Sequence, residues 1–420
     1  MTDAPHSSRE RRNDLDLLRV LLVFGLVFFH TARIFDTISL PEGVKNQPPS
    51  IAATIFAAFF ALWGMPLMFA IAGFAIWHSL MKRTGMAFVG DRVRRLVVPF
   101  VFGVLALVPL QVYFHIKQAE PAARMTYWQF LPKFLDVRPC PDLVNAFICP
   151  NTATGLFTTA HLWFLKDLFI FSVLLLPLFL YLRGKTGRGV VEILSGFLAR
   201  PGMIWLLALP VAGFEAGLVT STMGGGWNEY TYVVLLIAGF LIASDPHLAQ
   251  AMGRAWRSAL VIGLAVELVY MVGLYALMEI YQVDPLHDYD WGSLLWRGVK
   301  SLGAWAWVVA IIGFGSRPRS QPAAEGLHNP SGSADLRRPS LGARLITYCG
   351  EAFLAFYVLH QTVIFVIGYY VVQWEMAALL KYFVISLSSL ALTLLVYEIG
   401  VRRTKVTRWL FGMRTNLPAS

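Results

Sequence analysis

The chain has 420 residues, of which 57% are hydrophobic and only 14% are charged, and its mean hydropathy is +0.59. Soluble globular domains are about 45–50% apolar and about 25% charged, so this composition excludes an ordinary soluble enzyme. The formal net charge of +10 does not indicate nucleic acid, because lysines and arginines lie in short segments between apolar runs. Composition therefore predicts a protein whose main partner is the lipid bilayer, with no nucleic acid bound.

The start of the chain and the cysteines limit what else is present. Residues 1–16 are polar and basic, and no small-residue cleavage site clearly follows the first apolar run, which predicts a cytoplasmic tail before an uncleaved signal anchor. The three cysteines, Cys140, Cys149 and Cys349, lack the paired spacing of a zinc or redox site, so no metal is predicted. Whether Cys140 and Cys149 form a disulfide is left open.

Ten apolar runs approach or exceed the length of about 20 residues that a helix needs to cross a bilayer. They cover residues 17–38, 51–80, 96–116, 162–182, 203–222, 230–243, 256–278, 292–315, 345–373 and 378–400. Run 230–243 is short, and run 292–315 contains Arg297 and Lys300. The sequence thus predicts an all-α polytopic protein with about ten transmembrane helices, and one membrane domain over residues 17–400.

Lysine and arginine predict the orientation of these spans. The N-terminus, the connections after the second, fourth, sixth and eighth runs, and the tail 401–420 are all basic. They share one side only if there are ten spans, and by the positive-inside rule that side, with both termini, is cytoplasmic. The long loop 117–160 is then external. Residues 317–342, rich in Pro, Ser, Gly and Arg, are expected to be a flexible cytoplasmic linker.

The first run carries ionisable residues on one line. Arg19 and His30 are eleven residues apart, which places them some 20° apart around a helix and roughly 16 Å apart along it. Asp16 lies one turn before Arg19, and Arg33 lies one turn after His30. Two arginines snorkelling from the ends would be a purely structural explanation. We favour a functional stripe, because a helix in lipid gains nothing from four ionisable residues on one line.

Five motifs, in order along the chain, resemble landmarks of the membrane acyltransferase-3 family. They are LDLLRVLLVFGLVFFHTARIF at 15–35, PLMFAIAGF at 66–74, DRVRRLVVPF at 91–100, HLWFLKDL at 161–168 and CGEAFLAFYVLHQTVI at 349–364. Two departures are Ala70 and Ala72 where the family often has Val and Ser, and Ala352 with Phe353 in place of Ser-Tyr. The HLWFLKDL form, and the absence of an appended soluble domain, most resemble the glucan-biosynthesis branch, which is succinyltransferase-like.

The resemblance implies a multi-pass O-acyltransferase of the bacterial inner membrane. Its expected donor is cytoplasmic acyl-CoA, carrying an acetyl or succinyl group, and its expected acceptor is a hydroxyl of a cell-envelope glycan. Such a reaction needs a base for the hydroxyl proton, and histidine, with a pKa of about 6.5, suits that task at neutral pH. The resemblance implies His30 as this general base, while Arg19 near the cytoplasmic end would hold the phosphates of the donor.

Two later motifs supply further candidates. His161 opens the fourth run beside Trp163 and either orients a substrate or belongs to the interfacial belt. His360 lies in the middle of the ninth run with Tyr357 one turn earlier, and we expect a polar role for it in the cavity. The catalytic candidates are therefore Arg19, His30, His161 and His360, and the candidate substrate contacts are Arg33 and Tyr357.

Basic residues supply two further candidate sites. Arg92, Arg94 and Arg95 either contact phosphates of the donor at the cytoplasmic mouth or are only determinants of topology. Arg297 and Lys300 are either buried or snorkelling charges. If they are buried, the pair is expected to recognise an anionic acyl group such as succinyl.

The main rival function is a transporter or flippase for a glycan or another small molecule. The five ordered motifs favour the enzyme, and the chain has no visible internal repeat of the kind that many transporters have. No Ser or Cys stands out as a nucleophile, so direct transfer without an acyl-enzyme intermediate is expected. The acyl group, the acceptor and the oligomeric state are left open.

Overall fold

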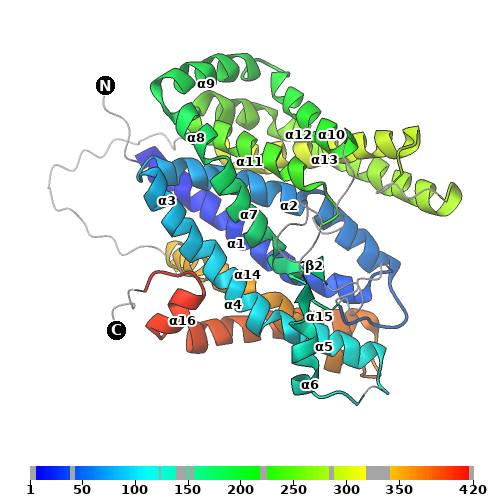
Figure 1. Cartoon of the computed structure of the whole chain (residues 1–420). Helices are drawn as coiled ribbons and strands as arrows, with labels where there is room; N and C mark the ends of the chain where they lie inside the picture. The colour runs from blue at the N-terminus through cyan, green and yellow to red at the C-terminus, as the bar shows by residue number, and fades with distance from the viewer. Residues whose placement is uncertain are drawn as a thin grey trace.

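The computed structural model describes residues 6–37, 43–122, 124–138, 149–150, 156–217, 225–282, 288–317 and 341–415, and this part of the chain is almost wholly helical. Figure 1 shows a single bundle with α1 (His6–Phe35) running through its middle. The start of α1, α3 (Gly85–Arg92) and α16 (Lys405–Leu410) lie at one end of the bundle, which we call the basic end (Figure 1). The end at which α1 finishes is called the distal end.

The first half of the chain forms a long span and several short helices. After α1 come α2 (Ile51–Leu80), α3, the π-helical turn η1 (Val93–Val97), α4 (Val98–Ala106), α5 (Val108–Ala119) and α6 (Tyr127–Phe134). Strands β1 (Val137–Arg138) and β2 (Cys149–Pro150) then pair antiparallel, with Val137 opposite Pro150. The 3-10 turn η3 (Ala160–Leu162), α7 (Trp163–Leu174), α8 (Leu176–Arg183) and α9 (Lys185–Leu198) follow.

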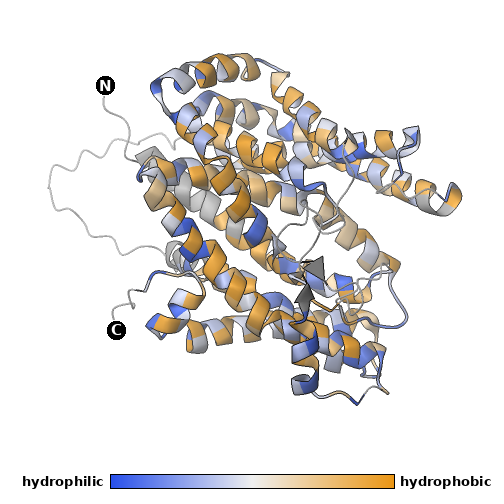
Figure 2. Cartoon of the chain, in the orientation of Figure 1, coloured by the Kyte–Doolittle hydropathy of each residue, from blue (hydrophilic) through white to orange (hydrophobic). Residues whose placement is uncertain are grey.

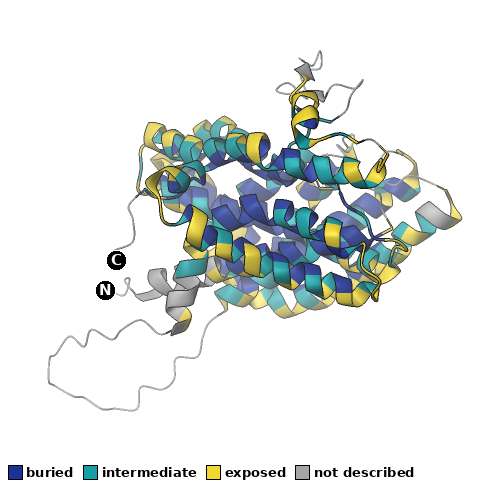
Figure 3. Ribbon diagram, turned by 90° about the horizontal axis from the view of Figure 1, so that it is seen from below, coloured by how far each residue is buried: buried dark blue, intermediate teal, exposed yellow. Residues whose placement is uncertain are grey.

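The second half is built from longer helices. It contains η4 (Met203–Leu207), α10 (Ala208–Gly217), α11 (Glu229–Ser244), α12 (Pro246–Tyr275), η5 (Ala276–Ile280), α13 (Trp291–Ser316), α14 (Leu341–Val371), α15 (Ala378–Val396), η6 (Tyr397–Val401) and α16. Figure 2 shows apolar residues along the length of these helices, and Figure 3 shows that the buried residues fill the centre of the bundle. The molecule is therefore a multi-pass membrane protein with a packed interior.

The expected ten spans stay a prediction. Among the described residues, six helices are long and apolar enough to cross a membrane, and eight if each of two bent helix pairs counts as one span. Two further apolar stretches, residues Val20–Phe35 of α1 and helix α11 (Glu229–Ser244), are shorter than the length of about 20 residues that a bilayer requires. The long span Gly85–Ala119 begins well before the expected residue 96, so the basic motif lies in a helix instead of a loop.

The two bent pairs have local causes. The pair Ala160–Leu174 and Leu176–Arg183 bends by 53°, where Pro177 removes a backbone donor at the start of α8. The pair Lys185–Leu198 and Met203–Gly217 bends by 119°, and Gly202 takes a left-handed φ of 80° at this corner. Residues 183–200, expected to be a connection, therefore contain the helix α9.

Helix α9 is amphipathic. It buries Val191, Ser195 and Leu198 against the protein. Its exposed apolar residues are Val190, Ile193, Leu194 and Phe197. The buried residues are three and four apart, so they share one side of the helix, and α9 packs against the protein on that side only.

Glycine allows α2 and α11 to touch backbone to backbone. A Cβ built at Gly239 would lie 1.9 Å from the carbonyl oxygen of Ala70, and one at Gly73 would lie 2.2 Å from that of Leu236. Membrane helices associate closely through small residues of this kind. The contact fixes α11 against the helix that packs beside α1.

Four expected segments differ from, or lie outside, the described structure. The tail 1–16 is partly helical, because α1 begins at His6. Loop 117–160 contains α6 and the two short strands, and Cys140 and the Cys149 side chain lie outside the described residues. Most of the linker 317–342 lies outside them as well. The tail 401–420 carries α16, whose Arg408 is buried and forms a 2.6 Å ion pair with Glu351.

Candidate functional site

Three histidines meet in the interior of the bundle. His30 comes from α1, His161 from η3 and His360 from α14. The ring centres of His161 and His360 are 5.0 Å apart, and His30 lies 5.2 Å from His360 and 6.3 Å from His161. His161 and His360 are buried, whereas His30 is half-buried. We call these three residues the histidine cluster.

The backbone of Tyr357 fixes the hydrogen positions on two of the rings. His161 Nε2 lies 3.0 Å, and His360 Nδ1 2.7 Å, from the Tyr357 carbonyl oxygen. A carbonyl oxygen only accepts hydrogen bonds, so each of these nitrogens carries the hydrogen and donates it. His161 Nδ1 and His360 Nε2 have no hydrogen-bond partner among the described residues. In the neutral form of each ring, these bonds select the tautomer whose other nitrogen keeps a lone pair inside the protein.

Neighbouring groups hold the cluster in place. The Tyr357 hydroxyl donates to the carbonyl oxygen of His161, so the tyrosine expected to contact substrate already has a structural partner. Phe356 stacks on His360 with the ring planes 9° apart. Ala160 takes a positive φ of 44°, which L-residues rarely adopt, directly before His161. The turn η3 thus sets the backbone so that His161 faces the interior and not the membrane interface.

Buried polar groups continue from the cluster along α5 and α14. Gln111 Nε2 donates to the Thr362 hydroxyl at 2.7 Å, and Gln111 is fully buried. The side-chain oxygens of Gln111 and Gln361 have no hydrogen-bond partner among the described residues. Orphaned acceptors of this kind are costly in a protein interior and are suited to receiving a hydroxyl hydrogen from a ligand.

The three arginines of the DRVRR motif lie at the basic end. Asp91 binds Arg83 at 2.6 Å, Arg94 at 3.2 Å and Arg95 at 3.1 Å. The guanidinium of Arg92 lies 4.8 Å from the centre of the Phe88 ring. One carboxylate on α3 thus gathers a cation from the preceding turn and two from η1, and this local positive charge favours an anion. The π-helical turn at η1 is a feature often found at functional sites.

The two arginines of the α1 stripe have different surroundings. Arg19 lies on α1 toward the basic end, and its side chain is outside the described residues. Arg33, one turn past His30, forms an ion pair with the buried carboxylate of Asp36. Lys45 pairs with the other oxygen of Asp36 at 2.5 Å. Burial lowers the pKa of the Lys45 ammonium, and the Asp36 carboxylate opposes that shift.

Arg297 and Lys300 are buried, but the structure gives them partners away from the histidine cluster. Lys300 forms a 2.6 Å ion pair with Glu215 of α10, and its Nζ lies 4.0 Å from the centre of the Trp227 ring. Arg297 donates to the carbonyl oxygen of Asp288 at 2.8 Å. The ion pair with Glu215 neutralises Lys300. That Arg297 and Lys300 recognise an anionic acyl group stays a prediction.

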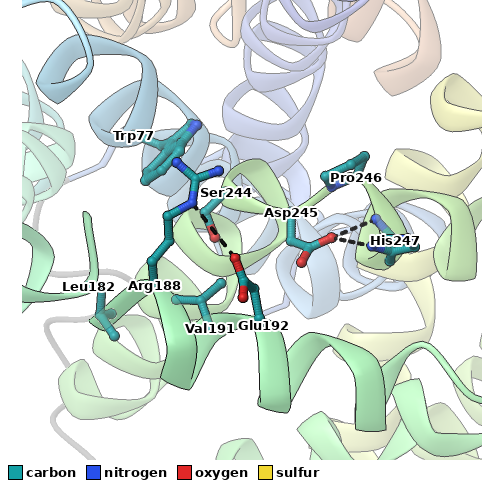
Figure 4. A pocket seen from close by; sticks show the side chains of 9 residues that line it. All are labelled: Trp77, Leu182, Arg188, Val191, Glu192, Ser244, Asp245, Pro246 and His247. Atoms are coloured by element: carbon teal, nitrogen blue, oxygen red, sulfur yellow. Dashed lines mark hydrogen bonds and ion pairs between the residues drawn. The ribbon is translucent and has the colours of Figure 1, made fainter. Parts of the chain in front are cut away.

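A cavity of about 300 Å³ opens between α2, α8, α9 and the start of α12 (Figure 4). Arg188 is 4.0 Å from Glu192, and His247 is 2.9 Å from Asp245. The charges at this cavity are therefore paired with one another, and no member of the histidine cluster lines it. Within the described residues, no group of His, Cys, Asp or Glu is placed to hold a metal ion.

Sequence reasoning missed several residues that shape the interior. Asp36 and Lys381 sit at the ends of apolar runs, and Glu215 sits inside one. A charge in or beside such a run is itself a signal, because it must find a partner in the folded protein. Gln111 and the strained Ala160 left no comparable signal in the sequence.

Comparisons with known proteins agree with the five motifs. The model of the acyltransferase-3 family, described as an acyltransferase domain, matches residues 12–398. That range includes the three histidines and the DRVRR motif. No curated protein and no solved structure matches the chain. Because the family model covers nearly the whole sequence, the chain belongs to the acyltransferase-3 family of membrane acyltransferases.

Proposed function

We propose that the protein transfers an acyl group from cytoplasmic acyl-CoA to a hydroxyl of a cell-envelope glycan, and that it works in a bacterial inner membrane. The observation that carries the proposal is the histidine cluster, with ring centres 5.0–6.3 Å apart inside the bundle. Neutral imidazoles that keep a free lone pair are general bases at neutral pH. The family match supports acyl transfer as the reaction class.

The donor enters from the basic end in this proposal. Arg94 and Arg95, gathered by Asp91, contact phosphates of the CoA nucleotide together with Arg92. Arg19 supplies a further cation on α1, about 16 Å along the helix from His30. The pantetheine arm then extends along α1 and brings the thioester to the histidine cluster. The pantetheine arm of CoA is long, so the phosphate site and the reaction site can lie far apart.

His30 is the proposed base, because it lies within 5.2 Å of His360 and 6.3 Å of His161 and is the least buried residue of the three. It takes the proton of the acceptor hydroxyl as the oxygen attacks the thioester carbonyl carbon. The carbon–sulfur bond breaks, the CoA thiolate leaves, and the imidazolium returns the proton to the sulfur. The products are the acylated glycan and free CoA, and no acyl-enzyme intermediate is required.

His161 and His360 have supporting roles in this scheme. Each is held by the Tyr357 carbonyl with one lone pair inside the protein. We assign them to orienting the acceptor hydroxyl and His30, while Gln111 and Gln361 accept hydrogen bonds from further hydroxyls of the sugar. A row of neutral acceptors suits a polyhydroxylated acceptor better than a charged one at this depth.

The test is thioester consumption by the purified protein in nanodiscs, with acetyl-CoA and succinyl-CoA as donors and a glycan extract as acceptor. His30→Ala should lower kcat by about 10²- to 10⁴-fold, the usual contribution of a general base. His247→Ala is the matched control, because His247 is exposed and pairs with Asp245 at the separate cavity. Equal turnover by wild type and His30→Ala would remove His30 as the base. Glycan movement across the bilayer without thioester loss would instead support transport.

A further inference from the structure

The distal end of α1 carries a group of cations that the proposed reaction does not use. Arg33 and Lys45 bind the two oxygens of Asp36, whose side chain is fully buried. Lys45 Nζ also donates to the Arg33 carbonyl oxygen at 2.7 Å. Asn46 follows Lys45, and its backbone N–H donates to the carbonyl oxygen of Ile34 at 2.8 Å. The loop after α1 is thus fastened back onto the end of that helix.

Lys381 joins this group from α15. Its Nζ donates to the Asn46 side-chain oxygen at 3.2 Å and to the Val372 carbonyl oxygen at 2.8 Å, and the residue is only 7% exposed. No carboxylate among the described residues forms an ion pair with Lys381. A buried ammonium held only by neutral oxygens is costly unless a charge of opposite sign accompanies it.

Within the described residues, the cations of this group outnumber its carboxylates. Arg33, Lys45 and Lys381 carry three cations, and Asp36 is the one carboxylate that the described residues place among them. These cations lie at the end opposite to the DRVRR motif, whereas lysines and arginines that only set topology concentrate on the cytoplasmic side. Topology therefore does not account for them, and the buried ammonium of Lys381 points to a ligand.

We propose that Arg33 and Lys45, which bind Asp36, and Lys381, which binds the neighbouring Asn46, form a distal anion site for a carboxylate or phosphate group of a substrate. This inference rests on the proposed function, in which His30 is the base. Arg33 lies one helical turn beyond His30 on α1. An anion held there sits beside the reacting groups on the side away from the CoA phosphates. Two sources have this chemistry, namely the distal carboxylate of a short dicarboxylic acyl group and an acidic group on the acceptor glycan.

The first experiment needs no catalysis. Thermal unfolding of the detergent-solubilised full chain is followed with succinate, with inorganic phosphate and with uncharged succinamide. A bound anion should raise the Tm of the wild type by about 2 °C or more, and succinamide should not. Lys381→Met should lose this rise, whereas Lys381→Arg, which keeps the charge, should retain it.

Lys117→Met is the matched control. Lys117 lies on α5, where its Nζ is 5.4 Å from the centre of the Tyr369 ring, outside the distal anion site. It should keep the full rise in Tm. No rise with either anion in the wild type, or a full rise in Lys381→Met, would overturn the proposal. Because this arm needs no turnover, it separates failure of the anion site from failure of the proposed acyl transfer.

The second experiment identifies the source of the anion by comparing succinyl-CoA with butyryl-CoA. If the acyl carboxylate binds, Lys381→Met should lower kcat/KM about tenfold more for succinyl-CoA than for butyryl-CoA, the effect of losing one charge-assisted hydrogen bond. If the acceptor supplies the anion, kcat/KM should fall equally for both donors, and only with acidic glycans. An equal fall with neutral glycans, or no fall at all, would contradict the distal anion site.

Discussion

Tyr357 and His161 are joined by two hydrogen bonds that run in opposite directions between α14 and η3. The Tyr357 hydroxyl donates to the His161 carbonyl oxygen, and His161 Nε2 donates to the Tyr357 carbonyl oxygen at 3.0 Å. The same Tyr357 carbonyl also receives the Nδ1 hydrogen of His360. One residue of α14 therefore sets the ring orientation of two histidines, and the first prediction follows from this arrangement.

Tyr357→Phe removes the hydroxyl and leaves the buried His161 carbonyl without that donor. Stability should fall by about 1–3 kcal/mol, the cost of an unsatisfied buried polar group. If Tyr357 positions the histidines, kcat should fall while the KM for acyl-CoA changes little. Thermal unfolding and steady-state kinetics measure the two effects. Tyr113→Phe, which loses a 3.4 Å bond to Met125 outside the cluster, should leave kcat unchanged.

The second prediction concerns the DRVRR motif. Arg95→Gln should raise the KM for acyl-CoA by about tenfold, because one charge-assisted phosphate contact is lost. The KM for the matching acyl-pantetheine, which lacks the nucleotide, should stay the same. Arg188→Gln is the control, since Arg188 is exposed and pairs with Glu192. An equal rise in KM for both donors would show that Arg95 acts on the fold and not on the phosphates.

The third prediction tests the role of the buried Lys300–Glu215 ion pair. Lys300→Met should destabilise the protein by about 3–5 kcal/mol, because it leaves the Glu215 carboxylate buried without its cation. Lys300→Met combined with Glu215→Gln should be less destabilised than the single variant. Succinyl and acetyl transfer should fall by the same factor in both variants. A selective loss of succinyl transfer would restore Lys300 as a substrate contact.

The fourth prediction concerns the backbone before His161. Ala160→Gly should stabilise the protein by about 1 kcal/mol, because glycine tolerates the φ of 44° that strains alanine. Ala265→Gly, at an exposed position within α12, should instead destabilise it by about 1 kcal/mol. Chemical or thermal unfolding of the two variants gives the comparison. Destabilisation by both would mean that η3 stores no strain.

The fifth prediction uses the close contact between α2 and α11. Gly239→Ala places a Cβ 1.9 Å from the Ala70 carbonyl oxygen, so α2 and α11 must separate. The loss of stability should exceed about 2 kcal/mol, as overpacking of a rigid contact costs about 1–3 kcal/mol. Gly213→Ala on α10, where the new methyl meets open space, should be neutral or stabilising. Similar losses in both variants would contradict the close contact.

Much of this architecture could be predicted because lipid restricts what a sequence can do. Runs of apolar residues indicated the helices, and polar residues within them singled out His30 and His360. That His161 would be buried beside them could not be predicted, because its position depends on the strained turn at Ala160 and on a carbonyl nearly two hundred residues later.

The partners of buried charged residues were the least predictable feature of the structure. Lys300 was expected to contact a substrate, and nothing in its sequence context indicated that Glu215 of another helix would neutralise it. Helix α9 was also missed. Its basic and small residues are typical of a connection between spans, and the helical spacing of its apolar residues was overlooked. Long-range contacts of this kind depend on how helices pack, which a single sequence does not specify.

The origin of the three histidines in distant parts of the chain has a consequence for biogenesis. His30 enters the membrane with the first helix, His161 follows near the middle of synthesis, and His360 arrives with the last pair of long helices. A nascent chain that ends before Tyr357 lacks His360 and also the Tyr357 carbonyl that orients His161. If the proposed acyl transfer needs all three histidines, a chain cannot carry it out until its synthesis is nearly finished.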